Sequence, residues 1–166
     1  ILNDKLRGFY LSTLNGRKYA VTQLEATDAR RAFPSFDEPA LKATFDISVT
    51  IAKGDTAISN GRVISDTPGP GDGRHTLTFS TTARMSSYLA ALAVGDFTCL
   101  SGSADSIPVR VCATPDKAHL GQLALDPEGV GLGGEAVARD AAVALVDAPV
   151  GAQRAVAGGV GEHARD

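Results

Sequence analysis

Two polar residues, Gln23 and Glu25, stand at the end of a stretch whose pattern predicts a β strand. In an extended chain, positions 23 and 25 project from the same face, so an amide and a carboxylate can reach one ligand together. The strand is predicted over 18–23, where Tyr19 and Val21 share one face. The alternative interpretation is that both residues are solvated polar side chains at a strand end. The residues alone leave both interpretations open.

The segment 30–39, RRAFPSFDEP, carries a second group of charged and hydroxyl side chains. Its two arginines precede its acidic pair at a spacing that permits ion pairs across the loop, and its two prolines restrict the backbone. We therefore interpret this segment as structural. Two catalytic alternatives are Ser35 as a nucleophile, which lacks a histidine in a recognisable arrangement, and Asp37 with Glu38 as a general acid/base pair.

The three histidines, His75, His119 and His163, are far apart in the sequence. A helical zinc site needs two histidines four residues apart on one face, with a further carboxylate. No H-E-x-x-H motif occurs in the 166 residues. We therefore expect these histidines to lie at the surface or to be hydrogen-bonded, and we expect this chain by itself to bind no zinc.

The two cysteines fall in strands that the pattern predicts over 88–100 and 106–113 and that form a hairpin across a polar loop. When the strands pair from the ends of that loop, Cys99 faces Ile107. The Cys112 position then lies about five residues further along the strand, or roughly 17 Å at the usual rise. A disulfide needs Cα atoms within about 7 Å. We therefore expect both cysteines to be reduced and to act as small apolar strand residues.

The remaining strand signals are short and closely spaced. The clearest covers 45–51, FDISVTI, in which apolar and polar residues alternate. Two further apolar runs flank Asn60-Gly61, a dipeptide that favours a tight hairpin turn, and another strand is predicted over 75–81. Connections this short are typical of a mainly β fold, either an antiparallel sandwich or a saddle-like sheet.

Composition and charge exclude two classes of partner. The chain is 43% hydrophobic and 21% charged, which is typical of a globular domain. Its net charge is −3, with basic residues scattered among acidic ones, so it lacks the electrostatic footprint of a nucleic-acid-binding protein. The longest apolar stretch, 88–94, is far shorter than the roughly 20 residues of a membrane helix. We expect neither a nucleic acid nor a membrane as a partner.

The last part of the chain differs in character from the rest. From 121 to 166 it is dominated by Gly, Ala and Val and contains no aromatic residue. The Ala-rich run at 135–148 predicts at most one short helix, because it has few large side chains to anchor it. The tail at 126–166 is either a frameshifted or truncated reading of a longer gene, or a genuine divergent tail.

The segment 21–51, VTQLEATDARRAFPSFDEPALKATFDISVTI, resembles the signature of the aminopeptidase N family of zinc metallopeptidases. The likeness covers about 2–125. It implies that 1–125 is part of the family's N-terminal β domain and that 126–166 is the divergent or frameshifted tail. It also implies a fragment of a zinc-dependent aminopeptidase, in which a separate domain, missing from this sequence, carries H-E-x-x-H and holds the zinc.

The resemblance also implies roles for Gln23 and Glu25. By position, Glu25 matches the family residue that contributes to recognition of the substrate's free α-ammonium group, with Gln23 as its polar neighbour. A partly shielded carboxylate binds an ammonium group by charge-assisted hydrogen bonds. The implied partners are the N-termini of peptide substrates and the missing catalytic domain. The alternative, from a different class, is a non-catalytic β-domain module for binding or interaction.

Overall fold

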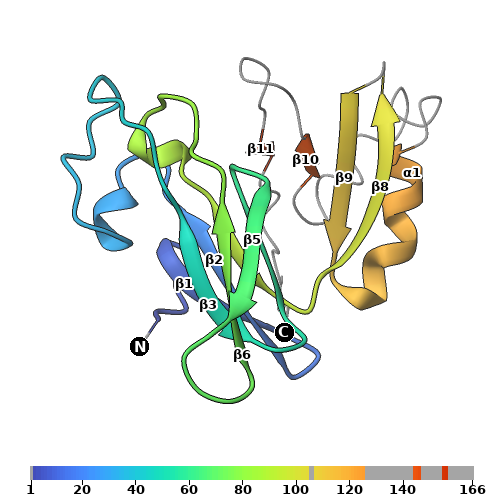
Figure 1. Cartoon of the computed structure of the whole chain (residues 1–166). Coiled ribbons are helices and arrows are strands. Elements are labelled where there is room, and N and C mark those ends of the chain that lie inside the picture. The colour runs from blue at the N-terminus through green and yellow to red at the C-terminus, as the bar shows by residue number, and fades with distance from the viewer. Residues whose placement is uncertain (1, 105–106, 126–143, 147–154, 157–166) are drawn as a thin grey trace, which may run out of the picture. The chain divides into compact units, whose positions relative to one another are not determined.

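The computed structural model describes residues 2–104, 107–125, 144–146 and 155–156 of the 166-residue chain. The chain forms two compact units, Ile1–Asp96 and Phe97–Asp166. Strands dominate the described part of both units (Figure 1). Every ladder between named strands is antiparallel. The predicted mainly β, antiparallel fold is therefore confirmed. The predicted boundary at residue 125 marks the end of the family resemblance, whereas the boundary between the two units is one of packing. The two units therefore do not test it, and it stays a prediction.

The wider sheet of the first unit has the strand order β1-β2-β7-β4. Its strands are β1 (Gly8–Leu14), β2 (Arg17–Gln23), β4 (Thr56–Ser59) and β7 (Leu92–Gly95). Strands β1 and β2 form a hairpin that turns at Asn15 and Gly16, whose φ angles are 50° and 78°. Two successive positive φ angles are what a tight two-residue hairpin turn needs. Strand β2 confirms the prediction for 18–23, whereas β1 was not predicted.

The second sheet of this unit has three strands in the order β3-β6-β5. These strands are β3 (Ser48–Ala52), β5 (Val63–Pro68) and β6 (Arg74–Phe79). The core between the two sheets contains buried Ile51, Ala57, Leu77 and Phe79, with Ile47, Val49, Leu92 and Val94 packed against them. The sheets thus form the two layers of a sandwich. The alternation predicted over 45–51 is what supplies the inward face of β3, although the ladder begins only at Ser48.

The hairpin predicted at Asn60-Gly61 is wrong, because β4 and β5 belong to different sheets. The Asn60 side chain instead bridges to another segment: its Nδ2 donates to the Leu89 carbonyl at 2.9 Å, and its Oδ1 accepts from the Ala91 N–H at 2.7 Å. A Cβ at Gly61 would collide with the carbonyl oxygen of Ser80. The dipeptide therefore lies in the connection between the two sheets, where Gly61 allows its backbone to approach that of Ser80 closely.

The strand predicted over 88–100 is divided into two. Strand β7 ends at Gly95, where the Tyr19 ring lies so close that a Cβ would collide with it. The next residue, Asp96, accepts a hydrogen bond from the Tyr19 hydroxyl and one of 2.7 Å from Arg17 Nε. These two bonds hold the pKa of Asp96 below its ordinary value, against the opposing effect of burial. The break at Asp96 separates the two units.

The second unit is a sheet with the order β11-β10-β9-β8. Its strands are β8 (Thr98–Ala104), β9 (Ile107–Ala113), β10 (Ala144–Val146) and β11 (Ala155–Val156). Strand β10 lies within the run 135–148 that was expected to hold at most one helix, and these three residues pair with β9 instead. The rest of that run lies outside the described residues.

The helical segments within the described ranges are all short. They are the 3-10 helices η1 (Ala29–Arg31), η2 (Ser87–Leu89) and η3 (Pro115–Leu120) and the helix α1 (Gly121–Leu125). Glycine allows α1 to approach β8 and β9 closely, because Gly121 lies against Leu100 and Val111. Among the residues that the structure describes, no helix is both long enough and apolar enough to cross a membrane.

The prediction that the two cysteines are reduced is wrong. Cys99 and Cys112 form a disulfide, with their Cα atoms 4.0 Å apart. The hairpin of β8 and β9 was predicted correctly, but its register was not. Strand β8 continues to Ala104, through residues that were assigned to the loop, so Cys99 pairs with Cys112 instead of Ile107. The error in loop length moved the partner of Cys99 by five positions.

Candidate functional site

Gln23 is the last residue of β2, and Glu25 lies two residues beyond it. Leu24 between them is only 2% exposed and packs in a cluster with Ala29 and Ala90. Both polar side chains are exposed, and neither forms a hydrogen bond or an ion pair within the described part of the chain. The alternation around Leu24 leaves an amide and a carboxylate available to a ligand. That they act on one ligand together stays a prediction.

A tight turn follows Glu25 and fixes its position. The Asp28 N–H donates to the Leu24 carbonyl at 2.9 Å. The N–H groups of Ala32 and Phe33 then donate to the Ala29 carbonyl at 2.9 and 3.0 Å. These bonds lie within one short segment, so the backbone on both sides of Glu25 is anchored while its side chain stays exposed.

Asp28 is the first of two buried carboxylates in this segment, with 3% exposure. Its Oδ2 accepts a hydrogen bond of 2.9 Å from Arg7 Nε, and its Oδ1 lies 2.7 Å from Arg31 Nε. The hydrogen bond from Arg7 holds the pKa of Asp28 below its ordinary value, although burial opposes this shift. Asp28 thus ties the entry of β1 to the turn that carries Glu25.

Asp37 is the second buried carboxylate, also 3% exposed. Its Oδ2 accepts bonds of 3.1 Å from both the backbone N–H and the Nε of Arg30, and its Oδ1 accepts one of 3.1 Å from Ser87 Oγ. Burial raises the pKa of Asp37, but the bonds from Arg30 and Ser87 outweigh it, so the net shift is downward. The expected ion pair across the loop is present for Arg30. Arg31 pairs with Asp28 and not with Glu38.

The two catalytic alternatives for this loop find no support in its geometry. Asp37 is buried with its acceptor positions occupied by Arg30 and Ser87, so it is not placed to exchange protons with a substrate. The Oγ of Ser35 is buried and has no hydrogen-bond partner among the described residues. A nucleophilic serine needs a base to accept its proton, and none is in contact here. The structural interpretation of 30–39 is the one that the contacts support.

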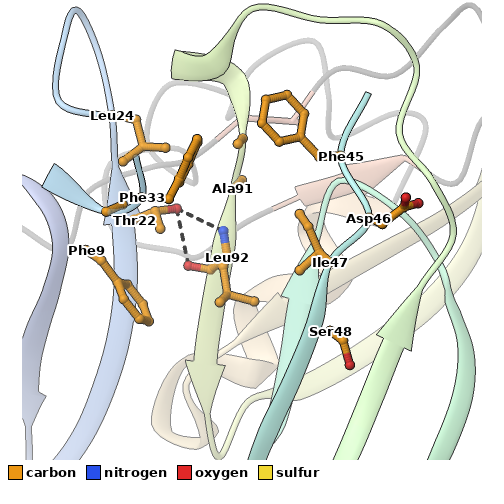
Figure 2. A pocket seen from close by; sticks show the side chains of 12 residues that line it. Phe9, Thr22, Leu24, Phe33, Phe45, Asp46, Ile47, Ser48, Ala91 and Leu92 are labelled. Atoms are coloured by element: carbon orange, nitrogen blue, oxygen red, sulfur yellow. Dashed lines mark hydrogen bonds between the residues drawn. The ribbon is translucent and has the colours of Figure 1, made fainter. Parts of the chain in front are cut away.

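A cleft of about 340 Å³ lies on the other side of β2. Thr22 and Leu24 line it, and by strand alternation their side chains point opposite to that of Gln23. Figure 2 shows its apolar walls, which are built mainly from Phe9, Leu24, Phe33, Phe45, Ile47 and Leu92. The Thr22 hydroxyl accepts from the Leu92 N–H at 2.9 Å and donates to the Leu92 carbonyl at 3.3 Å. Sequence reasoning missed this cleft because its walls come from segments far apart in the chain.

His75 and His119, the histidines that the structure describes, belong to no group of metal ligands among the described residues. The Nδ1 of His75 lies 2.8 Å from Asp66 Oδ1, and its Nε2 lies 3.3 Å from the Asp55 carbonyl oxygen, so this histidine is hydrogen-bonded as expected. His119 lies on η3, and His163 is outside the described residues. Within the described ranges, no three His, Cys, Asp or Glu side chains are grouped to hold a metal ion. The prediction that this chain binds no zinc stays a prediction.

Comparison with known proteins relates the first unit to peptidases. The family model of the peptidase M1 N-terminal domain matches residues 1–89. The puromycin-sensitive aminopeptidase of Caenorhabditis elegans is 47% identical over 131 residues, covering 75% of this chain and 14% of that protein. The alanine/arginine aminopeptidase of Saccharomyces cerevisiae is 45% identical over 130 residues, covering 75% and 15%. The aminopeptidase N of Acetobacter pasteurianus is 45% identical over 109 residues, covering 66% and 30%. The chain thus spans less than a third of each of these relatives.

Proposed function

The chain belongs to the peptidase M1 N-terminal domain family, and from this premise we propose that it is part of a zinc-dependent aminopeptidase, in which it binds the free N-terminus of a peptide. One observation carries the proposal: Glu25 is exposed and unpaired within the described part of the chain, beside Gln23, in the matched region. The relatives that cover this region are aminopeptidases by name.

The chemistry of the proposed site follows from what distinguishes a peptide N-terminus. A free α-ammonium group carries a positive charge and three N–H donors. An ionised glutamate at position 25 accepts such donors in charge-assisted bonds, which are stronger than bonds between neutral groups. The amide oxygen of Gln23 adds a neutral acceptor on the same side. Because Leu24 and the turn fix the backbone, little ordering of the site is needed when the substrate binds.

The zinc of such an enzyme does not fit the described residues, which form no group of potential ligands. The complete sequence also lacks H-E-x-x-H. We therefore assign the metal to a separate catalytic domain of a longer protein, and to this chain only the binding and orientation of the substrate amine. The partners in this proposal are the peptide N-terminus and that catalytic domain.

The test is the substitution Glu25→Gln in the full-length protein that carries this chain. The variant keeps size and hydrogen-bonding capacity but removes the charge. Loss of a bond to a charged group costs about 1.5–3 kcal/mol, so we expect kcat/KM for free-amine peptides to fall about ten- to a hundredfold. Glu38→Gln is the matched control, because Glu38 is also an exposed carboxylate of this segment. Equal activity of the Glu25→Gln and parent proteins would remove Glu25 from the site.

A second candidate function is a non-catalytic binding or interaction module, favoured by the absence of the zinc motif from all 166 residues. The DNA downstream of the gene discriminates between the two. An H-E-x-x-H motif in frame, or after a one-base shift, supports the aminopeptidase. A true stop codon with no such motif in any nearby frame supports the module.

A further inference from the structure

The two layers of the first unit differ in width. The sheet β1-β2-β7-β4 has four strands, and the layer packed on it has three. The core between them is formed with the β4 and β7 half, through Ala57, Leu92 and Val94. The pairs Ala20–Val94, Leu11–Ala20 and Phe9–Thr22 put Phe9, Leu11 and Ala20 of β1 and β2 on this same face. The described core cluster between the two sheets includes no residue of β1 or β2, so this half of the face is not covered by the three-stranded layer in that cluster.

The cleft marks the place where the narrower layer ends. One wall comes from the wider sheet, through Phe9, Thr22 and Leu92 (Figure 2). The other comes from the segment that leads into β3, through Phe45 and Ile47. Its volume is about 340 Å³. A cavity of about 150 Å³ is enough for a benzene-sized group, so the cleft has room for about two apolar side chains.

Strand β3 borders this cleft with an open edge. It is the first strand of the order β3-β6-β5, so one of its sides has no neighbour among the described strands. The Ile47 carbonyl accepts from the Phe79 N–H at 2.9 Å, which directs the backbone groups of odd-numbered residues toward β6. In an antiparallel ladder the intervening residues then point their N–H and C=O groups outward. The outward groups of β3 belong to Ser48, Thr50 and Ala52, and the Ala52 carbonyl already accepts from the Asp55 N–H at 3.2 Å.

The side chains of Ser48 and Thr50 are already engaged within their own sheet. Ser48 Oγ donates to the Leu77 carbonyl at 3.2 Å, and Thr50 Oγ1 lies 2.9 Å from Thr76 Oγ1. Only their backbone groups are left without a partner in the part of the chain that is described. An open edge of this kind is a template for strand addition, and here it runs beside an apolar cleft.

We propose that β3 and the cleft accept an added β strand from elsewhere in the longer polypeptide. Its backbone would pair with Ser48 and Thr50, and every second side chain, apolar in character, would enter the cleft against Phe9 and Leu92. The source of the strand rests on the proposed function, in which this chain is one part of a larger enzyme. The lengths agree with it, because the matched region is only 14% and 15% of two relatives.

The experiment uses the isotopically labelled 166-residue chain and a panel of overlapping synthetic peptides. The peptides cover the C. elegans relative outside the region that this chain matches. We expect peptides from one segment, with apolar residues at every second position, to bind. Binding should slow hydrogen exchange of the Ser48 and Thr50 amides at least tenfold, while the Val49 amide, already in the β6 ladder, changes little. Absence of binding across the whole panel would overturn the proposal.

A pair of variants at one position separates edge pairing from non-specific apolar binding. Ser48→Pro removes the outward N–H, and proline is tolerated in an edge strand where the N–H faces solvent. Ser48→Ala loses the same side-chain bond but keeps the N–H. We expect the proline variant, shown to be folded by unchanged amide shifts in β1 and β2, to bind at least tenfold more weakly than the alanine variant. Equal binding by the two would contradict pairing at this edge.

Two further outcomes concern the occupant and the underlying function. Sedimentation equilibrium that showed a dimer lost with Ser48→Pro would identify a second copy as the occupant and would overturn the assignment to the same polypeptide. The peptides are acetylated at their N-termini, so that they lack the free amine that Glu25 is proposed to bind. The Glu25→Gln variant should then bind them as the parent chain does, because Glu25 lies outside the β3 ladder. A failure of the Glu25 prediction and a failure of strand addition are therefore separate results.

Discussion

The acidic residues between positions 25 and 38 fall into two groups with opposite surroundings. Asp28 and Asp37 are each 3% exposed and are bound by arginines. Glu25 and Glu38 are exposed. The buried pair uses its charge to join the turn, η1 and the loop that follows, whereas the charge of Glu25 has no partner within the described residues. The segment thus holds structural carboxylates whose hydrogen-bonding capacity is used and exposed carboxylates whose capacity is free, and the proposed role of Glu25 requires the second property.

The largest loss of stability should come from changing Leu24, the buried residue between the exposed Gln23 and Glu25. Replacing Leu24 with Ala removes a side chain that is 2% exposed and leaves a cavity against Ala29 and Ala90. Such changes cost about 2–5 kcal/mol. We expect the urea midpoint of the first unit to fall accordingly. Leu41→Ala is the control, because Leu41 is 57% exposed and should change the midpoint little.

A smaller loss should follow from Asp37→Asn, which keeps the shape of a buried acceptor but removes its charge beside Arg30. We expect the melting temperature to fall by several degrees, and the same change at Glu38 to leave it unaltered. Because the folded pKa of Asp37 is lowered, its contribution is present above the unfolded pKa and is lost as pH falls through the folded value. Melting curves recorded toward acid pH should therefore converge for parent and variant; a constant difference would contradict this account.

The smallest effect on stability should come from the pair of His75 and Asp66. Asp66 is intermediate between the two groups above, because its carboxylate is exposed but has His75 as a partner. The hydrogen bond with Asp66 raises the pKa of His75. The stability that the pair adds is therefore complete below the ordinary histidine value of about 6.5, and it is lost as pH rises through the folded pKa. We expect the urea midpoints of the parent and Asp66→Asn to differ at about pH 5 and to agree at about pH 9. Agreement at both pH values would remove His75 from the set of stabilising contacts.

Local pattern predicted the parts of this fold that depend on neighbours in the sequence. The alternation over 45–51 identified β3 and its inward face, and the run at 18–23 identified β2. The same kind of signal was present for β1, where GFYLSTL precedes Asn15-Gly16, a pair that forms the hairpin turn. That strand could have been predicted. The dipeptide at 60–61 has the same letters but a different role, because tertiary contacts with Leu89, Ala91 and Ser80 decide its conformation.

The site was predictable only in its exposed part. Period-2 alternation was enough to expect Gln23 and Glu25 on one side of the chain, and both are exposed. The frame beneath them was only partly predictable: spacing suggested the pairing of Arg30 with Asp37, but Arg7 reaches Asp28 from 21 residues away. The cleft has no local signal, because its walls meet only after the two sheets have packed. Register in the β8–β9 hairpin depended on a loop length that the pattern did not determine.

The disulfide between Cys99 and Cys112 affects how proteolytic cleavage of the chain can be detected. Cys99 and Cys112 close a loop with a sequence separation of 13. A protease that cuts once between them produces two polypeptides that remain covalently joined. Such a nick leaves the mass of the molecule nearly unchanged under non-reducing conditions and becomes visible only after reduction. An electrophoretic comparison with and without reductant would therefore reveal damage to this hairpin that intact-mass purity checks overlook.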